Sequence, residues 1–173
     1  MSDEEEIRVS DAFRGEHRDV LLGPDGRVVW VAAWKPNVIV DTARNLIAAL
    51  LKGDSQGAAI ARWAVGAGEA VWDQSAPPPD AIRRTRSQLF AETGRKTIAA
   101  GQIIFLGGTF TNRLEITSSF TTADVPAGPL REFGLFAGGT NAANTGVLVN
   151  HRVHPRIDMQ AGFTLQRTLR LTF

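Results

Sequence analysis

Four charged residues lie among apolar neighbours in two separate segments of the chain: Glu92 and Arg95 in the first, Arg131 and Glu132 in the second. Carboxylate and guanidinium groups that leave water persist only when they are paired. The four residues are therefore candidates for structural ion pairs, and we predict that Arg95 pairs with Glu132. Such a pair joins the strand that follows a helix to the strand that carries Glu132. Its role is to stabilise the fold.

Carboxylates could also do chemistry, because two of them suffice to hydrolyse a glycosidic bond. The candidates are Glu92, Glu115 and Glu132, and ion pairing or a strand edge explains each position better. His151 and His154 are three positions apart, so on a strand they point to opposite faces and do not converge on a metal ion. We therefore predict no catalytic residue, no metal site and no enzymatic activity.

Composition narrows the possible functions further. The chain has 173 residues, 43% hydrophobic and 21% charged, which is enough for one folded domain with a core. A formal net charge of +1 gives no general attraction to nucleic acid or to an anionic membrane. The absence of cysteine excludes disulfides, thiolate ligands and cysteine nucleophiles. No cofactor is expected, since Gly66-Ala67-Gly68 lacks the third glycine and the lysine of nucleotide-binding loops.

The chain begins with an acidic stretch that contains Asp3, Glu4, Glu5 and Glu6. Signal peptides begin with basic residues, and no apolar run in this sequence approaches the ~20 residues that span a bilayer. We therefore expect a protein that is made and kept in the cytoplasm until assembly, without membrane insertion. We predict an acidic N-terminal arm, residues 1–16, and a single β-rich domain, residues 17–173, with a helix at about 38–52.

Alternation of apolar and polar residues indicates strands with one buried face. From Ile157 to Phe173 the odd positions are apolar except Arg167, which we expect to contact a carboxylate or to lie at the sheet rim. A similar alternation places large apolar residues on even positions between Phe110 and Phe120. These patterns predict an α+β fold, mainly an antiparallel β-sandwich-like domain with one or two short helices.

An early hairpin is predicted around the turn Gly23–Gly26, because Pro followed by Asp-Gly favours a tight turn. Its second strand, residues 28–34, is apolar on both faces, so we expect it to be buried on both sides. Trp30 and Trp34 share one face of that strand and are expected to pack in the core. Stacking on a sugar is the alternative.

Two helices are expected. Apolar residues recur at helical spacing over residues 38–52, with Asn37 as a cap and Gly53 as the close. A shorter amphipathic helix is expected from Asp80 to Glu92. It carries three arginines for which a solvated face is the preferred interpretation. The alternatives are a surface for nucleic acid or for an acidic partner, such as the acidic arm of a neighbouring subunit. The three arginines are Arg83, Arg84 and Arg86.

The most specific pattern runs from Leu130 to Arg152. An aromatic run, a turn rich in Gly and Asn, and a second apolar run predict a strand hairpin. Gly134 lies within the first strand, where glycine commonly lets a side chain or backbone approach closely. The turn Gly138–Thr145 is the part most free to touch another molecule. The predicted subunit-interface residues are Asp3, Glu4, Glu5, Glu6, Arg83, Arg84, Arg86, Asn141 and Asn144.

Four motifs occur in the order found in bacteriophage tail-associated structural proteins, and in that order the chain resembles tail-collar and tail-fibre attachment domains. They are Asn37-Val38-Ile39, Gly66-Ala67-Gly68, Leu89-Phe90-Ala91-Glu92-Thr93-Gly94-Arg95 and Arg131-Glu132-Phe133-Gly134-Leu135-Phe136. The resemblance covers residues 27–173 and implies a β-sandwich-like building block without catalytic residues. The chain lacks the repetitive shaft of a long tail fibre, which favours a compact subunit.

The sequence therefore predicts a non-enzymatic structural subunit of a phage tail or related contractile injection particle, such as a baseplate, collar, connector or fibre adaptor. Its expected partners are other virion or tail proteins and further copies of itself, because ring-forming particles have cyclic symmetry. Assembly is expected in the bacterial cytoplasm, and the final location is the virion or an extracellular tail-like particle. The alternative is a receptor- or glycan-binding module at the tail tip. A hydrolase is the third possibility.

Overall fold

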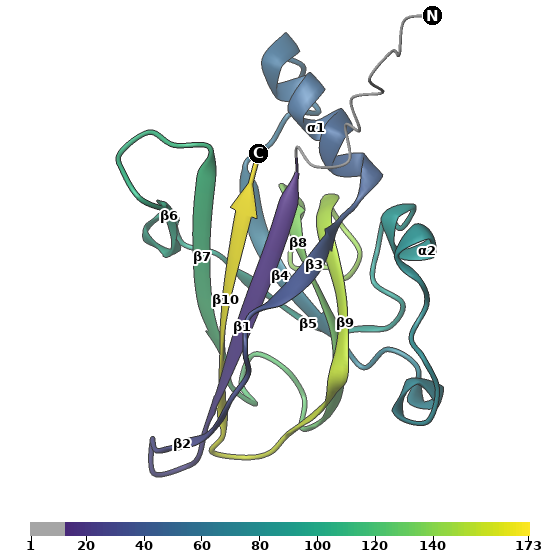
Figure 1. Cartoon of the computed structure of the whole chain (residues 1–173), viewed down its shortest axis with the longest axis vertical. Helices are drawn as coiled ribbons and strands as arrows, with labels where there is room; N and C mark the ends of the chain where they lie inside the picture. Colours follow the sequence, from purple (N-terminus) through teal and green to yellow (C-terminus); the bar gives the residue numbers. More distant parts are fainter. Residues whose placement is uncertain (1–12) are drawn as a thin grey trace, which may run out of the picture.

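The computed structural model describes residues 13–173 (Figure 1). The interface candidates Asp3, Glu4, Glu5 and Glu6 lie outside the described residues. The strands are β1 (Arg14–Leu22), β2 (Val28–Val31), β3 (Lys35–Ile39), β4 (Ile60–Gly66), β5 (Glu92–Thr97), β6 (Ile103–Phe105), β7 (Arg113–Phe120), β8 (Gly128–Ala137), β9 (Val147–Met159) and β10 (Thr164–Thr172). The helices are α1 (Asp41–Lys52) and α2 (Asp80–Arg84), with short 3-10 turns η2 (Ala70–Asp73) and η3 (Ala100–Gln102). In this part of the chain, no helix has the length and apolar character needed to cross a membrane.

The strands form a 10-stranded antiparallel sheet in the order β5-β4-β8-β9-β3-β1-β10-β7-β6, with β2 paired to β1. The sheet curls into a half-barrel, so that its two halves face each other across the core (Figure 1). The α+β class with mainly antiparallel strands and short helices is confirmed, whereas the sandwich-like arrangement is not. β1 begins at Arg14, within the stretch predicted as an arm.

The core lies between the two halves of the curled sheet. Trp63 of β4 meets Phe120 of β7 edge to face, with 6.1 Å between ring centroids. Leu165, Leu169 and Leu171 of β10 are buried in the same cluster. The predicted alternation is thereby confirmed along β10, because side chains two positions apart on a strand share a face. It does not extend to Ala161, which lies in a turn, or to Phe173, which is 37% exposed.

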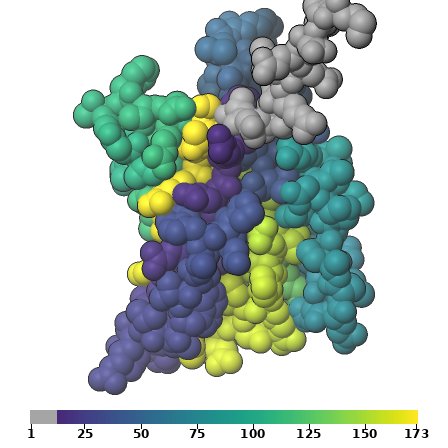
Figure 2. Space-filling model, in the orientation of Figure 1, coloured from purple at the N-terminus to yellow at the C-terminus, as the bar shows by residue number. Residues whose placement is uncertain are grey.

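β1 and β2 form the predicted hairpin, but the expectation that its second strand is buried is wrong. Three valines of this segment are between 46% and 59% exposed, namely Val28, Val29 and Val31. In residues 13–173 β2 pairs with β1 alone, and the hairpin projects from the body of the molecule (Figure 2). Trp30 packs against the core as predicted. Trp34 instead lies under the guanidinium of Arg170, 4.0 Å from it.

The first helix is shorter than predicted. α1 begins at Asp41, and Asn37 lies in β3, so Asn37 does not cap the helix. The Val-Ile-Val run after Asn37 has β-branched side chains that favour extended backbone, and its first two residues pair with β9. Gly53 closes the helix with φ 70°, as predicted.

The helix predicted from Asp80 to Glu92 ends early, because α2 covers only Asp80–Arg84. Leu89 turns inward and is 2% exposed, in a cluster with apolar side chains of β4, β8 and β9. The backbone N–H groups that follow it bond to a buried carboxylate, described below, and so do not continue a helix. Burial of one leucine and a specific polar contact therefore override the helical spacing.

Apolar residues between Ile98 and Leu106 are typical of a strand, but they do not form one continuous strand. The η3 turn interrupts the run, and only Ile103–Phe105 form β6. Phe110, predicted in the core, is 93% exposed, because β7 begins three residues later at Arg113. From Ile116 the even positions are buried, as predicted.

The hairpin predicted at Leu130–Arg152 is confirmed as β8 and β9, which pair along most of their length. β8 lies between β4 and β9. Its side chains are buried from Leu130 to Ala137. This strand is therefore the centre of one half of the sheet.

Changing Gly134 to Ala is expected to lower the free energy of unfolding by about 1–3 kcal/mol. A Cβ at this position lies 2.6 Å from Cδ1 of Leu148 and 2.7 Å from the carbonyl oxygen of Asn150, so the backbone must shift. Urea unfolding measures the change. Gly101→Ala is the matched control, because nothing lies within 4 Å of its Cβ. Equal stability of the two variants contradicts the close approach.

Candidate functional site

The curled sheet opens between β2 and β9. β3 pairs with β1 through three residue pairs and with β9 through two, so beyond β3 the strands β1 and β9 diverge (Figure 1). A cavity of about 610 Å³ lies in this opening. Its lining includes His17 and Asp19 of β1, Trp30 of β2, and Arg152 and His154 of β9.

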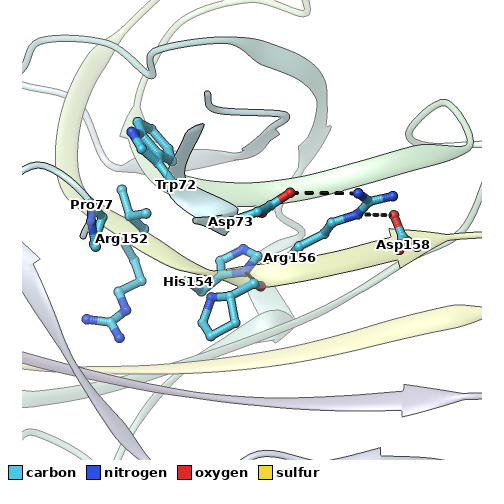
Figure 3. Close-up of a pocket in the computed structure, with 9 residues that line it drawn as sticks. Trp72, Asp73, Pro77, Arg152, His154, Arg156 and Asp158 are labelled. Carbon is cyan, nitrogen blue, oxygen red and sulfur yellow. Dashed lines mark hydrogen bonds and ion pairs between the residues drawn. The ribbon is translucent and has the colours of Figure 1, made fainter. Parts of the chain in front are cut away.

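A second cavity of about 690 Å³ adjoins the first along β9 (Figure 3). Both cavities are lined by the same four residues of β9, namely Arg152, His154, Pro155 and Arg156. In the second cavity Arg156 Nε donates to Asp158 at 2.7 Å, and its Nη1 lies 3.7 Å from Asp73. Arg152 extends away from these ion pairs, beside Pro77 (Figure 3).

Arg167 confirms the expectation that it finds a carboxylate. Its Nε and Nη2 donate to the two carboxylate oxygens of Asp19 at 2.7 and 2.6 Å, and the two residues are opposite each other on β10 and β1. The guanidinium carbon lies 4.0 Å from the ring centroid of Phe133. Burial alone raises the pKa of Asp19, but the charge and hydrogen bonds of Arg167 outweigh it and hold that pKa below its ordinary value. Asp19 lines the first cavity, and its partner Arg167 is fully buried.

Two neutral histidines flank this ion pair. His17 Nδ1 lies 3.1 Å from the carbonyl oxygen of Lys35, and His154 Nδ1 lies 2.8 Å from that of Pro155, so each Nδ1 carries the proton and donates it. Burial, followed by the charge of Arg167, lowers the pKa of His17 to about 4 and that of His154 to about 3. Both imidazoles are therefore neutral at pH 7, and the Nε2 of His154 faces Arg167 at 3.2 Å.

Acidification is expected to destabilise the protein between pH 6.5 and about 4. An unfolded histidine has a pKa of about 6.5, whereas folded His17 and His154 stay neutral down to about 4 and 3. The unfolded state then binds more protons, so stability falls as pH falls, by about 1.4 kcal/mol per pH unit and histidine. Urea unfolding at pH 7 and pH 5 measures this slope. His154→Gln should remove about half of it, and an unchanged slope in that variant contradicts the assignment.

The predicted ion pair between Arg95 and Glu132 does not form. Glu132 is fully buried and accepts hydrogen bonds from the backbone N–H of Phe90 at 3.0 Å and of Ala91 at 2.7 Å. Its other contact is Nε2 of His151, at 2.8 Å. β5 and β8 both pair with β4, and in that register Gly134 lies level with Arg95, which leaves Glu132 beside the segment before β5.

Arg95 pairs instead with Glu92 on the same strand. The Arg95 Nε and Nη2 donate to the carboxylate at 2.6 and 2.9 Å, and both side chains are 2% exposed. The pair fixes the turn between β8 and β9, because Arg95 donates to the carbonyl oxygen of Thr145 at 2.8 Å and Glu92 accepts from the N–H of Asn144 at 2.9 Å. Asn144 is therefore tied to the domain through its backbone, while Asn141 remains exposed.

Arg131 makes its own ion pair, separate from the other three predicted residues. Its Nε and Nη2 donate to both carboxylate oxygens of Asp73 at 2.8 and 2.6 Å, and Nη1 donates to the carbonyl oxygen of Ala67 at 2.9 Å. The hydrogen bonds from Arg131 hold the pKa of Asp73 below its ordinary value. This fork ties η2, and with it one wall of the second cavity, to β8.

The three arginines around α2 do not form one solvated face, which corrects that prediction. Arg83 is 7% exposed, donates from Nε to the carbonyl oxygen of Pro78 at 3.0 Å and pairs with Asp80. Arg86 donates to the carbonyl oxygens of Gln88 and Leu89 and covers the ring of Phe90. Arg84 alone is exposed. The five-residue helix packs on β3 and β9 and turns Arg83 toward the sheet, while Ile82 is 51% exposed.

The segment Gly53–Gly57 reads G-D-S-Q-G and matches the G-x-S-x-G pattern of serine-hydrolase nucleophile turns, a match that the sequence reasoning overlooked. In those enzymes the turn connects a strand to a helix. Here it connects α1 to β4, and Ser55 is exposed. The neighbouring Asp54 pairs with Lys52 at 2.8 Å. The match therefore lacks the structural context of a nucleophile turn.

Within residues 13–173, no group of three or more His, Cys, Asp or Glu side chains could hold a metal ion. No protein-family model and no curated protein matches this chain.

The two cavities offer paired charges, two neutral imidazoles and the guanidinium of Arg152. The Nε of Arg152 has no hydrogen-bond partner in the described part of the chain. This set suits binding of a polar or anionic group.

His17 and Asp19 were not predicted as site residues, because the predicted arm, residues 1–16, overlaps the start of β1. A usable signal was present. His17, Asp19 and Leu21 alternate with polar or apolar outward residues, and all three are buried on one face of β1.

Proposed function

We propose that this chain is a non-enzymatic structural subunit of a phage tail or related contractile injection particle, and that it binds neighbouring subunits. The order of the four motifs supports the assignment of the chain to such a particle. The curled sheet would serve as the sandwich-like body of the subunit. The observation that carries an assembly role is the exposure of large apolar side chains at two projecting parts of the sheet.

The first apolar patch surrounds β6 at one end of the sheet. Phe110 is 93% exposed, Ile104 50% and Phe105 42%. The two phenylalanine rings pack against each other, 5.8 Å apart. Exposed apolar patches and free strand edges are typical of protein contact surfaces.

The second patch is the β2 strand, with Val28, Val29 and Val31 exposed. Figure 2 shows both the β2 hairpin and the segment around β6 projecting from the body. The two patches differ in residues, so a contact between the β2 patch of one copy and the β6 patch of the next is heterologous. Heterologous contacts that close form rings.

Native mass spectrometry of the purified chain tests the assembly. We expect an oligomer, and we expect Phe110→Ser or Val29→Ser to shift it toward the monomer. Val71→Ser is the matched control, because Val71 is 56% exposed but lies on η2, away from both patches. A monomer for the unaltered chain, or equal masses for all variants, contradicts the proposal.

A receptor- or glycan-binding module is the second candidate, and the second cavity favours it. Trp72 lines this cavity together with Asp73, Arg156 and Asp158 (Figure 3). Sugar sites combine an aromatic face with polar groups in this manner. Binding to immobilised cell-surface glycans that is lost on Trp72→Ala supports the assignment as a glycan-binding module. Absence of such binding favours the structural subunit.

A further inference from the structure

The first cavity combines apolar and cationic side chains. Its apolar lining includes Trp30, Ala32 and Ile157, and the half-buried Trp30 also packs against the core. Its cationic lining includes Lys35 and Arg152. A volume of about 610 Å³ and an apolar lining with a few polar groups are typical of sites that hold a small organic molecule.

Arg152 brings an unpaired guanidinium to this cavity. The side chain is half-buried, yet its guanidinium makes no hydrogen bond and no ion pair with residues 13–173. Its Nε is enclosed, whereas the two terminal nitrogens, Nη1 and Nη2, keep accessible surface. The N–H groups of a guanidinium form a planar fork that matches the two oxygens of a carboxylate. The accessible end of Arg152 is therefore suited to bind a carboxylate.

The carboxylates that act on Arg152 are each bonded to another arginine. Asp19, which lines the same cavity, accepts hydrogen bonds from Arg167 through both of its carboxylate oxygens. Asp80 pairs with Arg83. An anion that enters the cavity therefore meets a guanidinium that no carboxylate of residues 13–173 binds.

A bulge in β9 forms part of the cavity wall. While β8 advances from Leu130 to Glu132, its partner β9 runs from Ile157 to Val153. The extra residues of β9 fall within 154–156, and all three line the cavity. Bulges re-aim side chains and are over-represented next to functional sites. The wall is thus built by a departure from regular strand pairing.

We propose that the first cavity binds a small aromatic monocarboxylate, with the carboxylate on Arg152 and the ring against Trp30. Aromatic rings pack on an indole in offset or edge-to-face arrangements, which adds to the burial of apolar surface. Lys35, which is exposed, adds a second positive charge to the lining. The fork of Arg152 selects a carboxylate, and the apolar lining selects an aromatic body over a hydrated ion. The site does not depend on the particle to which the chain belongs.

Isothermal titration calorimetry of the full chain with naphthylacetate at pH 7 tests the site. We expect saturable binding of one molecule per chain. The neutral naphthylacetamide has the same rings and should bind about tenfold to a hundredfold more weakly, because a hydrogen bond to a charged partner contributes about that factor. Acetate and inorganic phosphate lack the rings and should also bind about tenfold more weakly or less. No binding of naphthylacetate, or phosphate that binds as tightly, overturns the proposal.

Arg152→Gln separates a binding role from a structural one. It should weaken naphthylacetate about tenfold or more and leave naphthylacetamide within about twofold. Arg152→Lys keeps the charge without the planar fork, should weaken naphthylacetate about threefold to tenfold, and serves where thermal unfolding shows that the glutamine variant does not fold. Arg44→Gln on the exposed surface of α1 is the matched control and should not change binding. Equal affinities of the Arg152 and Arg44 variants contradict the proposal.

Tryptophan substitutions identify the cavity that holds the ring, because Arg152 lines both. Trp30 lines the first cavity and Trp72 the second. Trp30→Leu should weaken naphthylacetate about tenfold, whereas Trp72→Leu should leave its affinity within about twofold. Trp30 also packs against the core, so Ala32→Phe, which narrows the first cavity, replaces this variant where it does not fold. Binding that is lost on Trp72→Leu and kept in the first-cavity variant overturns the proposal.

Discussion

Asp19→Asn is expected to lower the free energy of unfolding by about 3–5 kcal/mol, the usual cost of removing one partner from a buried ion pair. The substitution leaves Arg167, which is 0% exposed, without its carboxylate, and the neutral His154 and the Phe133 ring beside it do not replace that negative charge. In a domain of this size 1 kcal/mol shifts Tm by about 2–4 °C, so Tm should fall by about 6–20 °C. Urea and thermal unfolding at pH 7 measure both quantities.

The control for this prediction is an ion pair that β10 makes with its other neighbour, β7. Glu115 pairs with Arg170 at 2.9 Å, but the two side chains are 22% and 30% exposed, so Glu115→Gln should cost less than about 1 kcal/mol. The double change Asp19→Asn with Arg167→Met removes both charges and should recover much of the lost stability. Similar losses of unfolding free energy for the Asp19 and Glu115 variants would mean that burial does not determine how much the Asp19–Arg167 pair stabilises the fold.

Glu132→Gln is expected to lower the free energy of unfolding by about 2–4 kcal/mol, because hydrogen bonds to a buried charged group contribute about 1.5–3 kcal/mol each and the variant cannot accept all of them. The carboxylate accepts from two backbone N–H groups and lies 2.8 Å from His151 Nε2. An amide must place its NH2 group against one of these donors. Local hydrogen exchange should rise at Phe90 and Ala91.

Glu69→Gln provides the comparison for this substitution, since Glu69 is an exposed residue. Its stability should remain within about 0.5 kcal/mol of the unaltered chain. Thermal and urea unfolding that show no loss for Glu132→Gln mean that the carboxylate does not organise the segment before β5. Unchanged hydrogen exchange at Ala91 leads to the same conclusion.

Local patterns predicted those features whose cause is local. The alternation along β10 predicts its buried face and singles out Arg167, because side-chain direction on a strand has a fixed period. The turn of the β8–β9 hairpin and the αL glycine at position 53 follow from backbone preferences of single residues. The close approach at Gly134 follows from the same reasoning.

The features that were predicted wrongly depend on how strands far apart in the sequence pair with one another. Arg95 and Glu132 are separated by β4, and the register of β4 with β5 and with β8 shifts by extra residues that no local pattern records. Asp19 meets Arg167 because β1 and β10, 148 positions apart in sequence, pair at that register. The exposure of β2 and Phe110 depends on where the sheet ends, and an apolar run of four residues does not encode that position.

The location of the chain in a particle tests the proposed function most directly. Gold-labelled antibody against the chain would be imaged on tail-like particles purified from cells that encode it, before and after removal of their fibre tips. We predict regular labelling of the particle body that persists after the tips are removed. Particles without label contradict the proposed function, and label that disappears with the tips assigns the chain to the receptor- or glycan-binding class.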